Sequence, residues 1–170
     1  MPVAPVRSWD HVVLDWSPPV PRTSRPAAPV PHIHEPVTRL TDHAAEARRL
    51  ANEGSLVEAL IACDQAIETD RLVAANYYLR GIILQEQNAV EEAVTALKRA
   101  LYLDHDFVVA HFMLGNLMLR EGRSRDAARC FDNARALLRT QPPETELPDS
   151  DGITAGRLLA ILTSLQEVAA

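Results

Sequence analysis

Tyr78 and Phe112 mark the positions at which this sequence is best suited to recognise another molecule. They stand 34 residues apart, and polar and apolar side chains recur beside them at the same interval. Aromatic rings supply large apolar contacts, and guanidinium and amide groups supply directional hydrogen bonds, which suits peptide or helix recognition. The sequence therefore predicts a partner-binding groove formed by Arg48, Asn52, Tyr78, Ile82, Glu86, Phe112, Asn116 and Arg120. The alternative is that both rings only pack against a neighbouring helix.

Motifs for catalysis or cofactor binding are absent from the sequence. The chain has 6 glycines, and no two of them are spaced as G-x-G. A nucleotide or S-adenosylmethionine loop needs such glycines because its backbone amides must approach the ligand. Neither G-x-S-x-G nor H-E-x-x-H occurs. We therefore expect no catalytic residue, no cofactor and no metal.

The cysteines and histidines have structural interpretations. Cys63 and Cys130 fall on apolar helix faces, where cysteine behaves as a small hydrophobe, so we expect both to be buried rather than reactive. His32 and His34 have no cysteine or carboxylate partners at metal-ligand spacing, so we expect solvated side chains. His111 stands where a large packing residue is expected, and we assign it a structural role.

The overall composition is that of an ordinary soluble globular protein. The chain has 170 residues, of which 47% are hydrophobic and only 5% aromatic, which favours closely packed helices of Ala, Leu, Val and Ile. The net charge of -6 disfavours binding to nucleic acid or to an anionic membrane. No apolar run approaches the roughly 20 residues of a membrane span. Two cysteines suit a reducing compartment, so we expect a cytoplasmic protein. The predicted groove indicates a protein partner.

Proline marks a boundary near residue 40. Nine of the 12 prolines lie before it. Because proline removes amide donors and fixes φ, such a segment cannot form a helix or a central strand. We expect residues 1–39 to be a proline-rich linker that is mostly disordered. A linker at the start of a chain also suggests an upstream domain.

Residues 40–140 contain no proline, and their apolar side chains recur at intervals of three and four. This spacing predicts amphipathic helices. Short breaks between the helices are expected at residues 53–55, 87–89 and 121–123. Each break contains Gly or Asn, the residues that tolerate the left-handed conformation at a helix end. A further helix is expected after residue 152, capped by Ser150 or Asp151.

A fixed period of 34 residues relates the helices to one another. Gly115 repeats Gly81 and Ala127 repeats Ala93 at that interval. A helix–turn–helix period of this length, with small residues at fixed places, resembles the tetratricopeptide repeat. Glycine lets the paired helices approach closely, and one bulky residue of each repeat should wedge between them. That position holds Cys63, Leu97 and Phe131.

The predicted fold is all-α, a right-handed α-solenoid of three repeat helix pairs and a C-terminal capping helix. The repeats are expected at residues 40–73, 74–107 and 108–141. Residues 142–170 should form a loop and the last helix. That helix would either cover the exposed apolar face of the third repeat or lie in the groove.

The polar residues of the repeats limit which partners fit. The carboxylate clamp of chaperone-binding repeats has Lys and Asn where this chain has Ala44 and Arg48. We therefore do not expect chaperone C-terminal tails as ligands. Arg123, Arg125 and Arg129 make a small basic face, which we interpret as solvated, with a docking role as the alternative.

Three segments resemble the C-terminal repeat region of CheR-type chemoreceptor methyltransferases. They are LVAANYYLRGII (72–83), ALYLDHDFVVAHFMLGNLMLREGR (100–123) and LPDSDGITAGRLLAI (147–161). In that family a SAM-dependent protein-glutamate O-methyltransferase domain is followed by a proline-rich linker and then by the repeats. This chain departs from the family at His105, where proline is usual, and in lacking the catalytic domain.

The resemblance implies a non-catalytic module of a chemosensory system. Such a module would dock the methyltransferase on its receptor or regulate methylation of the receptor glutamates. Its partner would be a chemoreceptor cytoplasmic domain or a methyltransferase domain, and the Tyr78 and Phe112 groove would hold a helical ridge of the receptor. The alternative is a generic adaptor or scaffold in an unrelated protein complex.

Overall fold

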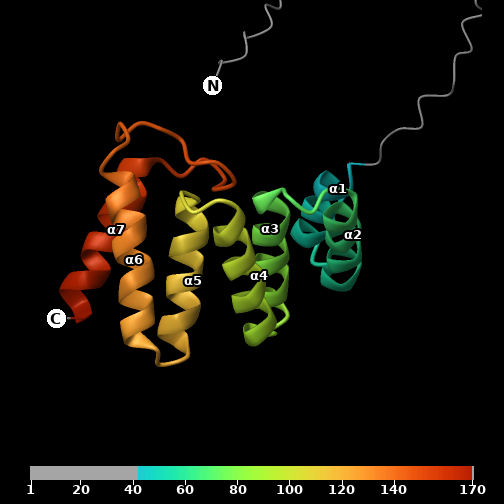
Figure 1. Cartoon of the computed structure of the whole chain (residues 1–170), viewed down its shortest axis with the longest axis horizontal. Helices are drawn as coiled ribbons and strands as arrows, with labels where there is room; N and C mark the ends of the chain where they lie inside the picture. Colours follow the sequence, from blue (N-terminus) through green and yellow to red (C-terminus); the bar gives the residue numbers. More distant parts are fainter. Residues whose placement is uncertain (1–41, 170) are drawn as a thin grey trace, which may run out of the picture. The chain divides into compact units, whose positions relative to one another are not determined.

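The computed structural model describes residues 42–169, with side chains as far as Leu165. The predicted linker at residues 1–39, with His32 and His34, lies outside the described residues. The described part contains seven helices and no regular strand (Figure 1). They are α1 (His43–Asn52), α2 (Leu56–Thr69), α3 (Ala74–Glu86), α4 (Val90–Leu103), α5 (Val108–Arg120), α6 (Ser124–Leu138) and α7 (Ala155–Ala169).

Three tight turns join the helices into pairs, at the breaks that the sequence predicts. Gly54, Asn88 and Gly122 have φ of 81°, 60° and 70°, the left-handed conformation that ends a helix. After each of them the next amide donates to a carbonyl five residues back, which satisfies an orphan acceptor of the preceding helix. These bonds are Ser55 N to Leu50 O (2.9 Å), Ala89 N to Leu84 O (2.9 Å) and Arg123 N to Met118 O (2.8 Å).

The helices stack as an all-α solenoid. α1 packs on α2, α3 on α4 and α5 on α6, and each pair contacts the next through α2 with α3 and α4 with α5. Figure 1 shows the pairs side by side in chain order. The predicted solenoid of helix pairs is therefore confirmed.

Small residues let the two helices of a pair approach, as predicted. A Cβ added to Gly81 would lie 2.8 Å from Leu97 Cγ, and one added to Gly115 would lie 2.7 Å from Phe131 Cδ1. Both distances are far shorter than the roughly 3.5–4.0 Å of an ordinary carbon contact. Leu97 and Phe131 thus fill the space that the glycines leave open.

The last helix covers the third pair. α7 packs on α6 and buries Leu158 and Leu162 in the same core as Leu117 and Leu138 of α5 and α6. The last helix therefore covers the apolar face of the third repeat and does not lie in the groove. A solenoid needs such a cap because its terminal repeat would otherwise expose an apolar face.

The predicted cap of α7 was wrong. The amides of Ala155 and Gly156 donate to the carbonyls of Thr145 (2.8 Å) and Pro143 (2.9 Å), and the amide of Arg157 donates to Thr154 Oγ1 at 3.4 Å. Ser150 does not reach the helix, because its hydroxyl donates to Leu147 O at 2.6 Å instead. Thr154 and the backbone of the preceding loop therefore cap the helix, and Ser150 stabilises that loop.

Candidate protein-binding groove

A hollow of about 140 Å³ lies between α1, α3 and the loop that precedes α7. Its lining residues are Arg48, Ala51, Asn52, Tyr78, Leu79, Ile82, Asp149 and Asp151. The first helices of the first two pairs supply six of these residues, because Arg48 and Asn52 share one face of α1, and Tyr78 and Ile82 share one face of α3. Four of the eight predicted groove residues therefore meet here: Arg48, Asn52, Tyr78 and Ile82.

The other four predicted residues do not line this hollow. Glu86 and Arg120 are exposed at the far ends of α3 and α5, and Asn116 is half-buried on α5. Phe112 is also half-buried, and its ring packs against Phe131 of α6 with centroids 6.2 Å apart. The assignment of these four residues to a continuous groove stays a prediction.

Tyr78 forms the boundary between the hollow and the core. Its side chain is only 6% exposed, and its ring lies 5.0 Å from the ring of Phe107, which precedes α5. Burial, followed by the nearby carboxylates of Asp149 and Asp151, raises the pKa of Tyr78 to about 12. These contacts favour the packing interpretation for the ring, and they keep its hydroxyl protonated beside the hollow.

The loop before α7 is an ordered hairpin, which the sequence did not predict. Glu146 and Thr154 form an antiparallel bridge, and Leu147 N donates to Ile153 O at 2.9 Å. At the tip, Asp149 and Asp151 have φ of 55° and 52°, a conformation that Asp tolerates better than most residues. The hairpin therefore holds its two carboxylates in fixed positions.

An ion pair ties this hairpin to the other end of the solenoid. Arg48 Nη2 lies 2.6 Å from Asp149 Oδ1, and the side chains are 46% and 23% exposed. Leu147 at the base of the tip is buried in the core of the later repeats. The hairpin is thus anchored by one apolar and one charged contact, and it forms one wall of the hollow.

A second hollow, of about 220 Å³, lies at the first turns of α3 and α5. The hairpin residues Leu147 and Asp149 line it, together with Phe107 and two further carboxylates. The charged residues that line the two hollows are Arg48, Asp104, Asp106, Asp149 and Asp151. The surface formed by the first helices is therefore mixed, with apolar walls and a mainly acidic rim.

Cys63 and His111 have the structural surroundings that the sequence suggests, whereas Cys130 is only half-buried. Cys63 is fully buried, and its Sγ donates to Asn76 O at 3.3 Å. Burial, and then the charge of Asp64, raises its pKa to about 12, so the thiolate is disfavoured. His111 is 8% exposed, and its Nε2 lies 2.9 Å from His105 O.

Within residues 42–169 no three His, Cys, Asp or Glu side chains are grouped so as to hold a metal ion. No helix in that range combines the length and the apolar character needed to cross a bilayer.

Comparison with known proteins gives two curated relatives. Tetratricopeptide repeat protein 33 of Xenopus laevis is 32% identical over 127 residues, which are 71% of this chain and 48% of that protein. DnaJ homolog subfamily C member 3 of Rattus norvegicus is 28% identical over 104 residues, which are 61% of this chain and 20% of that protein. The chain thus spans about half of one relative and a fifth of the other. No protein family model matches it.

Solved structures share the fold at low identity. The translocator chaperone SycD of Yersinia enterocolitica has a TM-score of 0.63 at 15% identity, covering 74% of this chain and 86% of that one. PcrH in complex with the chaperone-binding region of PopB has a TM-score of 0.62 at 19% identity, covering 72% and 90%. The second repeat domain of RPAP3 bound to an HSP90 peptide has a TM-score of 0.54 at 20% identity, covering 56% and 88%.

These proteins do not include a chemoreceptor methyltransferase, so that finer resemblance stays a prediction. The repeat period, the glycine contacts between paired helices and the relatives agree on the fold. The described part of the chain is a tetratricopeptide-repeat solenoid.

Proposed function

We propose that this chain is a non-catalytic protein-interaction module that holds a partner segment on the surface formed by its first helices. The observation that carries the proposal is the hollow in which exposed Arg48 and Asn52 stand beside the apolar wall of Ile82. Apolar contact together with directional polar groups is what peptide recognition needs. Solved structures of the same fold contain peptide ligands, namely the PopB region on PcrH and the HSP90 peptide on RPAP3.

The charges of this surface favour a neutral or basic segment. Four aspartates and one arginine line the two hollows, and the arginine is already paired with Asp149. An acidic tail would meet like charges there, which weakens binding. This supports the expectation that acidic chaperone tails are not its ligands.

We further propose that the chain is part of a chemosensory methyltransferase system. It would dock a protein-glutamate methyltransferase on its receptor, or regulate the methylation of receptor glutamates, in the cytoplasm. The support is the resemblance of residues 72–83, 100–123 and 147–161, and the two free cysteines fit a reducing compartment. The second candidate is a generic adaptor in an unrelated complex, for which the fold and the repeat-containing relatives are the support.

The binding surface is tested by filling the hollow. Asn52→Trp places a large side chain in it, and Glu92→Trp places the same side chain on the exposed surface of α4. Proteins captured from native lysate by the full wild-type chain and by both variants are quantified by mass spectrometry. A specific partner should be lost with Asn52→Trp and retained with Glu92→Trp; equal capture by both variants contradicts the assignment of the hollow.

The chemosensory role is tested with purified components. Binding of the chain to a receptor cytoplasmic domain and to a methyltransferase domain is measured, together with the rate of receptor methylation with and without the chain. Binding to either component that Asn52→Trp weakens supports this role. If neither component binds while another captured protein still depends on Asn52, the generic adaptor stands.

A further inference from the structure

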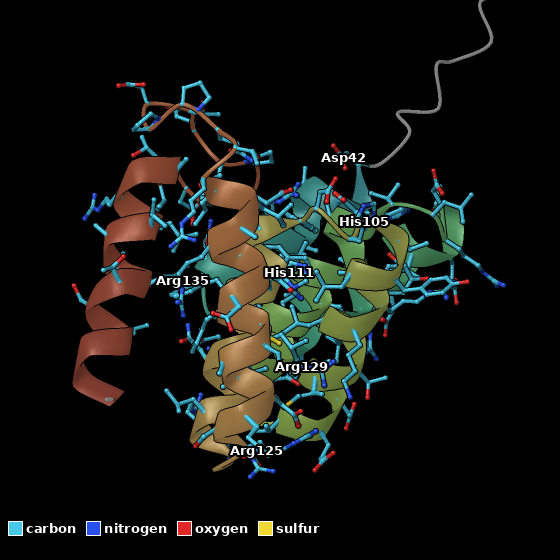
Figure 2. The ribbon with its side chains drawn as sticks, turned by 60° about the vertical axis from the view of Figure 1, so that its left-hand side comes forward. Asp42, His105, His111, Arg125, Arg129 and Arg135 are labelled. Carbon is cyan, nitrogen blue, oxygen red and sulfur yellow. The ribbon has the colours of Figure 1, made fainter. Side chains whose placement is uncertain are left out.

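A third hollow, with different chemistry, lies between the second helices of the last two pairs. It has a volume of about 290 Å³, with walls from α4 and α6 and a floor from α5. Leu101, Leu114 and Met118 give it apolar surface, and Lys98, Arg123 and Arg129 stand around it. Figure 2 labels His111 of α5 above Arg129 and Arg125 of α6. This site is separate from the groove between α1 and α3.

The cations at this hollow are only partly neutralised. Arg123 pairs with Asp126, with Nη2 2.6 Å from Oδ2, whereas Lys98 and Arg129 make no ion pair with any described residue. Burial and then Asp126 raise the pKa of Cys130 in the wall, while Arg129, Lys98 and Arg123 act in the opposite direction. Three cations therefore surround one thiol, in a protein whose net charge is -6.

One ring nitrogen of His111, in the floor, has no hydrogen-bond partner among the described residues. Its Nε2 must carry the proton, since its neighbour is the carbonyl oxygen of His105, which can only accept. Its Nδ1 is buried and has no hydrogen-bond partner among the described residues. A buried acceptor of this kind is satisfied by an ordered water or by a donor from outside the chain.

The outer face of α2 has the complementary chemistry. Val57 and Ile61 are 65% and 56% exposed, and Glu68 follows them on the same stripe of the helix. The helix contains Glu58, Asp64 and Glu68 and no lysine or arginine. Asp64 is paired with Arg80, with Oδ1 2.8 Å from Nε, so Glu58 and Glu68 supply the negative charge of this face. Two large exposed apolar side chains beside carboxylates suit a hollow that has an apolar floor and a cationic rim.

We propose that the hollow between α4 and α6 binds the acidic outer face of α2 from a second copy of this chain. Val57 and Ile61 contact the apolar floor, and the carboxylates of α2 meet Lys98 and Arg129. The two surfaces are different patches of one chain, so the contact is heterologous and head-to-tail. It leaves the proposed peptide groove between α1 and α3 free.

The test is a reciprocal charge exchange, measured on the full chain by analytical ultracentrifugation over a concentration series. Lys98→Glu with Arg129→Glu makes the hollow acidic, and Glu58→Lys with Glu68→Lys makes the helix face basic. Each double variant alone should associate at least about tenfold more weakly than the wild type, because like charges then face each other. An equimolar mixture of the two should associate again, because each variant then finds a complementary surface on the other.

Controls separate this contact from general charge effects and from misfolding. Arg139→Glu with Arg157→Glu makes the same change in net charge at exposed positions outside the hollow and should leave association unchanged. Recovery in the mixture excludes misfolding as the cause of the loss. A wild-type chain that stays monomeric throughout the series, a double variant that associates like the wild type, or a mixture that does not recover would each overturn the proposal.

Discussion

Gly115→Ala probes the close approach on which the helix pairs depend. A methyl group at this position would overlap the Phe131 ring, with its Cβ 2.7 Å from Cδ1 and 3.0 Å from Cζ. The ring is buried and already packs against Phe112, so it cannot move aside without disturbing a second contact. The substitution therefore overpacks the interface between α5 and α6.

Two opposing contributions determine how much Gly115→Ala changes the free energy of unfolding. Overpacking a well-filled core costs about 1–3 kcal/mol, and three ring atoms in conflict place this site near the upper value. Alanine is the better helix former by about 1 kcal/mol. We therefore expect a net loss of about 2 kcal/mol of unfolding free energy, against the gain of about 1 kcal/mol expected for an unobstructed helical glycine.

The first repeat shows which pair of residues would accommodate an alanine in place of Gly115. At the equivalent positions it has Ala47 and Cys63, an alanine facing a small partner in one buried cluster. In a Phe131→Cys background, Gly115→Ala rebuilds that pair and should no longer overpack. It should then stabilise by about 1 kcal/mol, so the coupling energy of the double-mutant cycle is about 3 kcal/mol.

Urea unfolding followed by circular dichroism gives the four free energies of this cycle. Gly122→Ala is a useful comparison, because an added Cβ meets nothing within 4 Å there and the φ of 70° alone should cost about 1–2 kcal/mol. If Gly115→Ala had the same effect with Phe131 and with Cys at that position, within about 0.5 kcal/mol, the close-approach explanation would be refuted.

Three further predictions concern charged and titratable groups. Asp149→Asn keeps a residue that tolerates the φ of 55° and should cost less than about 1 kcal/mol, because the ion pair with Arg48 is partly exposed, yet it should speed proteolysis within the hairpin, which limited Glu-C digestion measures. Cys130 should be alkylated before Cys63 in the native protein, since Cys63 is fully buried; mass spectrometry of iodoacetamide-treated protein shows the order, and the reverse order contradicts the assigned burial. Stability should fall between pH 9 and pH 12, because the pKa of Cys63 is raised from 9.0 to about 12 on folding and that of Tyr78 from 10.0 to about 12, so the unfolded chain loses its protons first. Unfolding free energies at pH 8 and pH 11 check this, and Cys63→Ala should reduce the difference.

The helix ends and the contacts within each helix pair could be predicted from the sequence, because the same residue pattern occurs in more than one repeat. Gly81 with Leu97 and Gly115 with Phe131 obey the same 34-residue period, so one pattern gives both contacts. Helix ends follow similarly, because Gly54 and the equivalent residues of the later pairs need a left-handed backbone.

The hairpin contact could not be predicted in this way. Arg48 and Asp149 are 101 residues apart and belong to no repeated pattern, so nothing local indicates that they meet. The composition of residues 142–152 predicts a loop, but its order comes from Leu147 entering the core and from Ser150 bonding within the loop. Periodicity also places Phe112 in line with Tyr78 without revealing that Phe131 covers its ring.

Site-specific photo-crosslinking shows whether a partner binds at the hollow between α1 and α3. A photo-crosslinking amino acid replaces Asn52 at the hollow in one full-length variant, and Glu92 on the exposed surface of α4 in another. After irradiation in cells that express the chain, crosslinked proteins are identified by mass spectrometry. We expect a specific partner that crosslinks from position 52 and not from position 92. A partner that crosslinks from position 92 and not from position 52 would contradict this expectation.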